Sequence, residues 1–123
     1  MLDQWLREAK QSPCADQIGM YLFHNGVVRA TARDRVREGK ACPPVAGMRF
    51  SCDGAGAERV AEETRKLPGI YYVRVWLNEG ELKVGDDLML VLVGGDTRPH
   101  TVDALQFLVE KLKTECVAET EVY

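Results

Sequence analysis

The sequence lacks the short motifs that identify the common nucleotide-binding and hydrolytic enzymes. It contains no G-x-x-x-x-G-K-[ST] run, no G-x-G-x-x-G after a strand and no G-x-S-x-G. A phosphate-binding loop, a dinucleotide fingerprint and a nucleophilic-serine turn of the usual kinds are therefore excluded. Internal repeats and low-complexity segments are also missing. We therefore expect one domain over residues 1–123.

An excess of charge of one sign is missing too. Sixteen Lys and Arg residues stand against nineteen Asp and Glu residues, which leaves a net charge of −3. A global basic field is thus absent, so nucleic acid is not an expected partner. The apolar runs are far too short to span a membrane, and charges at positions 3, 7, 8 and 10 exclude a secretory signal. We expect a cytoplasmic protein without a membrane partner.

Cysteine and histidine are too few and too widely spaced to predict a metal site. The four cysteines stand at positions 14, 42, 52 and 116, without C-x-x-C spacing, and the histidines are His24 and His100. This pattern does not complete a zinc motif, so we expect reduced thiols, no metal and no cofactor. We interpret His24 as a core or edge histidine of a strand rather than as a ligand.

A strand, a glycine-containing turn and a helix follow one another between residues 88 and 113. The continuous apolar run over 88–93 predicts a strand buried on both faces. We expect Gly94 and Gly95 to end this strand and to let the backbone turn. The helix that follows has one apolar stripe, formed by Val102, Leu105, Leu108, Val109 and Leu112.

The turn over residues 94–101 allows two interpretations. Free backbone N–H groups and the positive end of the helix dipole meet at a helix start, which is a common geometry for binding an anion. The guanidinium of Arg98 could donate two parallel hydrogen bonds to such an anion. The alternative is an ordinary connection with solvated charges, because few such turns hold a ligand.

The remaining elements complete an α+β fold. A short amphipathic helix over 2–9 is expected to dock through Trp5. Another helix follows Asp53 as its N-cap and stops at Pro68. Strand composition is found over 20–30, 45–52, 70–78 and 81–84. We predict a mostly antiparallel sheet with helices packed on one face, in which 70–78 and 88–93 are neighbours.

Two segments leave alternatives open. Asn25-Gly26 permits a hairpin turn, but we prefer one long strand in which the glycine admits a close neighbour. Residues 31–44 are basic and end in Pro43-Pro44, which forbids a helix across the join. They form either a solvated loop or a cationic flap that orders on an anionic substrate.

Arg29, Arg98 and Lys113 are cations placed where an apolar element meets a loop or a helix end. Arg98 precedes the last helix and Lys113 lies near its other end, so about 20 Å separates them along the axis. One small ligand cannot contact both within one chain. Either they serve different ligands, or a symmetric dimer brings Arg98 of one protomer beside Lys113 of the other.

Several segments together resemble a known family, in its order and near its spacing over roughly residues 19–115. They are Gly26 to Arg29, 48–52 with the helix through Glu62-Glu63, 80–82 with Gly85-Asp86, and 96–98 with the helix ending at Leu112-Lys113. The chain resembles the large, catalytic subunit of molybdopterin synthase, the MoaE family. The resemblance implies a hammerhead-like α+β fold, a homodimer and a role in molybdenum cofactor biosynthesis.

The resemblance also implies a reaction and its residues. Each protomer would receive the Gly-Gly tail of a small ubiquitin-like sulfur-carrier subunit. The tail's thiocarboxylate would supply sulfur to cyclic pyranopterin monophosphate. Lys113 would be the catalytic residue that meets this tail, and Arg29 and Arg98 would bind the anionic groups of the pterin phosphate substrate. His100 is a candidate substitute for the histidine that the family has before Arg98.

The sequence departs from the family in ways that leave a second function open. Leu77-Asn78 stands where the family has a histidine-arginine pair, and Thr97-Arg98 keeps only the arginine of a second such pair. Thr120 falls where a second lysine is expected, between two carboxylates. Basic residues of the 33–40 segment would then replace the lost cation in a sulfurtransferase. The alternative is a catalytically impaired member that acts as a dimeric scaffold for a pterin, an anion or a partner subunit. The surroundings of position 120 discriminate between the two.

Overall fold

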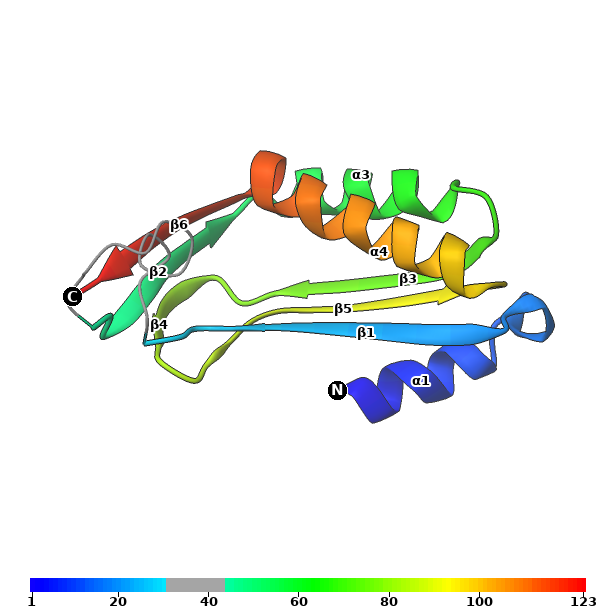
Figure 1. Cartoon of the computed structure of the whole chain (residues 1–123), viewed down its shortest axis with the longest axis horizontal. Coiled ribbons are helices and arrows are strands. Elements are labelled where there is room, and N and C mark those ends of the chain that lie inside the picture. Colours follow the sequence, from blue (N-terminus) through cyan, green and yellow to red (C-terminus); the bar gives the residue numbers. More distant parts are fainter. Residues whose placement is uncertain (31–43) are drawn as a thin grey trace.

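Two three-stranded antiparallel sheets form the framework of the chain (Figure 1). The first has the order β1 (Met20–Val27), β5 (Asp87–Gly95) and β3 (Ile70–Leu77). The second has the order β4 (Gly80–Lys83), β2 (Gly47–Cys52) and β6 (Val117–Val122). This computed structural model describes residues 1–30 and 44–123. The predicted basic loop or flap lies outside the described residues apart from Pro44.

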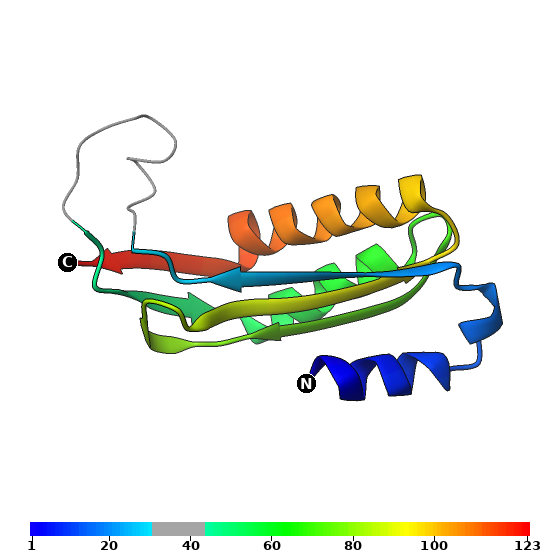
Figure 2. The same cartoon turned by 60° about the horizontal axis from the view of Figure 1, so that its bottom comes forward.

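Helices cover both faces of the first sheet. The helices α3 (Gly54–Arg65) and α4 (Arg98–Lys111) lie side by side on one face, and α1 (Leu2–Lys10) lies on the other (Figures 1 and 2). A short 3-10 turn, Ala15–Gln17, connects α1 to β1. The predicted α+β class with a mostly antiparallel sheet is confirmed. The position of α1 refines it, because only the two longer helices share a face.

The central strand β5 is buried as predicted. Residues 89–95 are all buried, and β5 pairs with β1 on one side and β3 on the other. The strand ends at Gly95, as predicted, but both glycines belong to β5 and the chain bends at Asp96 and Thr97. Tyr21 lies close above Gly94, and the start of α4 lies close above Gly95 through Thr101. These glycines therefore provide space for close neighbours rather than a turn.

The helix α1 docks through Trp5, which is 4 % exposed. Its indole packs with Leu90 and Leu92 on the face of the sheet opposite α3 and α4. The guanidinium of Arg74 lies 5.2 Å from the indole centroid and pairs with Glu8 on the same helix. The apolar contact and the cation–π contact together fix α1 on β5 and β3.

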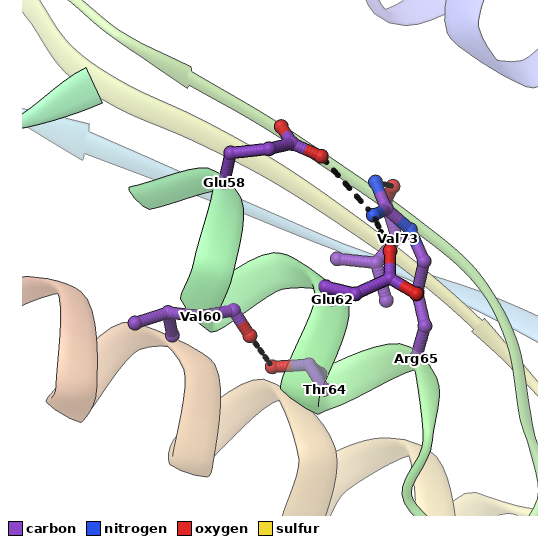
Figure 3. A network of polar contacts seen from close by, with 6 residues as sticks. All are labelled: Glu58, Val60, Glu62, Thr64, Arg65 and Val73. Carbon is purple, nitrogen blue, oxygen red and sulfur yellow. Dashed lines mark hydrogen bonds and ion pairs between the residues drawn. The ribbon is translucent and has the colours of Figure 1, made fainter. Parts of the chain in front are cut away.

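A polar network fixes α3 on β3 (Figure 3). Arg65 Nη2 donates a hydrogen bond of 3.0 Å to the Val73 carbonyl, while Nη1 pairs with Glu62 and Glu58 at 2.8 and 3.2 Å. Residue Asp53 occupies the N-cap position as predicted, but its side chain forms no capping hydrogen bond. The helix is therefore held mainly by its buried face and by Arg65.

The segment after residue 116 forms the strand β6, which pairs antiparallel with β2. Thr120 is the register partner of Arg49, and both side chains are exposed. Glu119 and Glu121 pair with Phe50 and Met48, so alternation places them on the opposite face of the sheet. The apolar and polar residues of 117–122 alternate only weakly, yet this segment forms a strand.

Candidate functional site

A pocket of about 540 Å³ lies between β1 and the last turns of α4. The strand contributes a histidine, and the helix and the turn after it contribute two apolar side chains, three polar side chains and a lysine. The lining residues are His24, Leu105, Gln106, Val109, Glu110, Lys113 and Thr114. A concave site with apolar walls and a few converging polar groups is typical of ligand binding.

The apolar face of α4 divides between the core and this pocket. Leu108 and Leu112 are 0 % exposed and pack against the sheet, with Thr101 and Ala104 on the same side. Leu105 and Val109 are only half-buried and line the pocket. Within the predicted apolar stripe, Leu108 and Leu112 are thus fully buried, whereas Leu105 and Val109 pack at the edge of the core and also line the pocket.

The helix widens into a π turn where it reaches the pocket. This turn, Leu112–Cys116, contains Lys113 and follows α4 without a break. Thr114 Oγ1 donates a hydrogen bond of 2.9 Å to the Glu110 carbonyl, which the altered helix ladder leaves accessible. A π turn changes the direction of the side chains it carries, and such turns are frequent at functional sites.

Lys113 is the available cation of the pocket. Its neighbour Lys111 is occupied, because its ammonium lies 3.3 Å from Glu63 and 3.6 Å from Glu115. Lys113 is exposed, and within the described part of the chain no carboxylate forms an ion pair with it. Within the described residues, no ion pair therefore has to be broken before the ammonium of Lys113 binds an anion.

His24 lies in the pocket as an uncharged ring. Its Nε2 is buried and finds no hydrogen-bond partner within residues 1–30 and 44–123. Burial, together with the like charge of Lys113, lowers the pKa of His24 below its ordinary value. The ring is therefore neutral at pH 7. Of the two structural positions expected for His24, in the core or on an edge strand, the structure shows the edge, since β1 is an edge strand of its sheet.

Gly26 keeps the space beside this ring open. The predicted long strand is confirmed, because Asn25-Gly26 lies within β1 and forms no hairpin. A Cβ at position 26 would lie 3.8 Å from His24 Nε2 and 3.5 Å from Met89 Cγ. A side chain there would cover the unpaired nitrogen, so the glycine leaves room beside it.

The other predicted anion-binding residues lie away from this pocket. Arg29 is exposed just beyond the end of β1. Arg98 and His100 are exposed in the first turn of α4, about 20 Å along the helix from Lys113. Within a single chain they are thus far apart, as the sequence indicated.

The start of α4 already holds an anion from the chain itself. Asp96 Oδ1 accepts a hydrogen bond of 2.6 Å from the Thr97 N–H and lies 2.8 Å from His100 Nδ1. The hydrogen bond from His100 lowers the pKa of the Asp96 carboxyl. In this structure the turn is an ordinary connection in which Asp96 occupies the start of the helix, and Arg98 is exposed beside it.

Position 120 does not bring negative charge into the pocket. Neither Glu119 nor Glu121 lines it, and the register places Arg49 directly across from Thr120. Arg49 lies 3.3 Å from Glu81 of β4, and both side chains are exposed. A solvent-exposed pair of this kind contributes little stability, so Arg49 is easily released.

His24 is the pocket residue that the sequence did not reveal. A histidine on a strand is usually structural, and its approach to Lys113 joins residues far apart in the chain. The only sequence signal was its place two residues before Gly26, on the same face of the strand.

Among the described residues, no three His, Cys, Asp or Glu side chains gather as metal ligands. Within the same residues, no helix is long and apolar enough to cross a membrane.

Comparison with known proteins places these features in one family. The sequence pattern of the family described as MoaE protein matches residues 2–115. No curated protein is similar enough in sequence to count as a relative.

Solved structures share the fold. A molybdopterin biosynthesis MoaE protein from Burkholderia ambifaria MC40-6 superposes with a TM-score of 0.72 at 22 % identity, over 99 % of this chain and 82 % of that one. Molybdopterin synthase from Staphylococcus aureus gives 0.71 at 17 %, over 88 % and 77 %. A complex of subunits 1 and 2 of molybdopterin-converting factor from Helicobacter pylori 26695 gives 0.67 at 16 %, over 99 % and 80 %.

Proposed function

The chain belongs to the MoaE family of molybdenum cofactor biosynthesis, and from this premise we propose that it acts as the large subunit of a molybdopterin synthase. In this role it transfers sulfur from the thiocarboxylate of a small subunit to a pterin phosphate. The observation that carries the proposal is the exposed ammonium of Lys113 in a pocket with apolar walls. Such walls strengthen the attraction between a cation and an anionic tail.

The partner of this chain is, in the proposal, a small ubiquitin-like subunit with a Gly-Gly tail. The Helicobacter pylori structure of the same fold is a complex of two subunits of molybdopterin-converting factor. The tail enters the pocket and brings its anionic end to Lys113. Glycines at the end of the tail fit because they let its backbone approach Leu105 and Val109 closely.

The pterin phosphate is bound, in the proposal, by Arg29 and Arg98, with His100 beside the second arginine. Guanidinium groups suit phosphate because they donate paired hydrogen bonds. Since Arg98 and Lys113 lie about 20 Å apart on one helix, a homodimer must join them. Each site then combines Lys113 of one protomer with Arg98 of its partner.

Arg49 is the cation that lies nearest in register to position 120, although it does not line the pocket. It stands across from Thr120, which occupies the position of the expected second lysine, and its pair with Glu81 is exposed and weak. The scaffold alternative required Glu119 or Glu121 to line the pocket. Neither does, whereas the basic residues of 33–40 that the enzyme would use lie outside the described residues, so the enzyme proposal depends on Lys113.

The first experiment measures sulfur transfer from a thiocarboxylated small subunit to cyclic pyranopterin monophosphate. Lys113→Ala should reduce the rate at least about 30-fold, because losing a charge contact of about 2 kcal/mol in the transition state corresponds to that factor. Lys66→Ala is the matched control, since Lys66 is exposed at the end of α3. Equal rates for wild type and Lys113→Ala would refute the proposal.

A second experiment tests the shared site. Lys113→Ala and Arg98→Ala proteins are unfolded together and refolded as a mixture. Half of the dimers then carry one variant of each kind, and one of their two sites has both wild-type residues. About one quarter of the wild-type rate should therefore return if the site is built by two protomers. A mixture no more active than its components would exclude the shared site.

A further inference from the structure

The unpaired nitrogen of His24 is the polar feature of the pocket that the proposed sulfur transfer does not use. Its Nε2 is buried and without a hydrogen-bond partner in the described chain, while the ring lines the pocket beside Lys113. Leaving a buried acceptor unpaired costs about 1–3 kcal/mol, so such groups in folded proteins usually serve a purpose. A ligand that supplies the missing partner gains this free energy when it binds.

A hydrogen bond accepted by Nε2 of His24 requires the tautomer in which Nδ1 carries the hydrogen. The nearby positive charge of Lys113 favours a lone pair over an N–H group on the ring nitrogen that is turned toward it. Rotation about the Cβ–Cγ bond of a histidine is soft, and Gly26 leaves space on one side. The ring can therefore turn its acceptor toward a ligand without moving the strand.

One cation and one neutral acceptor in the same pocket fit a particular chemical group. Lys113 attracts a negative end, and His24 accepts from an N–H close to that end. The terminal residue of a peptide offers both, because its amide N–H lies within a few ångströms of its own carboxylate. A phosphate fits less well, since it offers no N–H, and the carboxylate of Glu110 in the lining repels a second negative charge.

We propose that His24 binds the incoming tail by accepting, through Nε2, a hydrogen bond from the amide N–H of its terminal glycine. Lys113 holds the anionic end of the same glycine. This inference rests on the proposed function, because it concerns the tail that the pocket receives. It assigns His24 to substrate positioning and assigns the phosphate of the pterin to a different part of the site.

The test is a double-mutant cycle between the protein and a synthetic peptide. Peptides that end in Gly-Gly or in Gly-sarcosine, both with a free carboxylate, are titrated into the full chain by calorimetry. Sarcosine keeps the carboxylate but replaces the amide hydrogen by a methyl group. Wild type should bind the sarcosine peptide about tenfold more weakly, the usual value of one hydrogen bond left unmade. His24→Phe should bind the two peptides equally.

Two further variants separate this inference from the proposed function. His24→Gln, which keeps a side-chain acceptor, should recover part of the preference for Gly-Gly. Lys113→Ala should weaken binding of both peptides by the same factor and keep the preference. Equal preference in wild type and His24→Phe overturns the inference while leaving the proposed function intact. Failure of wild type to bind the Gly-Gly peptide overturns the tail-binding pocket itself. Circular dichroism of each variant confirms that it is folded.

Discussion

Replacing Leu108 with alanine should destabilise the chain far more than replacing Leu105, although the two leucines are three residues apart on α4. Leu108 is 0 % exposed and lies in the core between α4 and the sheet. Leu105 is half-buried and faces the open pocket. The two substitutions remove the same atoms from the same helix, so helix propensity changes equally and burial alone differs.

The expected magnitudes follow from these two environments. A fully enclosed leucine cut to alanine loses its transfer free energy and leaves a cavity, which together cost about 2–5 kcal/mol. Leu105 loses roughly half the transfer term, and the space it leaves joins an existing pocket. Its substitution should therefore cost about 1 kcal/mol. The difference between the two variants should be about 2 kcal/mol.

Urea denaturation of both variants measures this difference. The transition midpoint should shift strongly for Leu108→Ala and slightly for Leu105→Ala, with an unchanged dependence of free energy on urea. A thermal melt should separate the variants by roughly 10 °C. Equal destabilisation would refute the division of α4 into a core side and a pocket side. It would mean that Leu105 and Leu108 contribute equally to the core.

Two further predictions concern packing and titration. Gly95→Ala should destabilise the chain by about 1–3 kcal/mol in a urea melt, because the added Cβ would overlap Thr101 Oγ1 at the start of α4; wild-type stability would refute the close packing. The pKa of His24 is lower in the folded chain than in the unfolded chain, so the unfolded chain binds a proton first as the pH falls. The folded state is therefore most stable, as far as His24 is concerned, above the ordinary pKa of histidine, and it loses stability at lower pH. The stability of His24→Phe should therefore decline less than that of wild type between pH 7 and pH 5 in parallel urea melts, and identical slopes would refute the assignment.

The fold was largely predictable because the local amino-acid composition indicates most of its strands and helices. The apolar run over 88–93 has no polar face, so only a strand covered on both sides can hold it. Trp5 likewise marks the face by which α1 docks. The tail after residue 116 was harder to predict, because its alternation is weak and its pairing with β2 depends on a distant strand.

The sequence is ambiguous where one residue type serves two physical purposes. Gly94 and Gly95 suit a turn or a close approach equally well, and only the neighbours Tyr21 and Thr101 decide between them. The site residues illustrate a different limit. The role of Lys113 was assigned through a resemblance, whereas the place of His24 in the pocket was found only when β1 was seen to lie beside α4. Contacts between distant segments cannot be read from local composition.

The π turn at 112–116 also sets the phase of everything that follows it. A π turn holds about one residue more than an α turn, so tightening 112–116 into regular α-helix with all its residues kept would advance the chain that follows by about one residue, or roughly 100°. On β6 a shift of one residue exchanges the two faces, because side chains alternate along a strand. Glu119 and Glu121 would then stand where Thr120 now faces Arg49. A single extra residue thus determines whether neutral or acidic side chains share a face with that arginine.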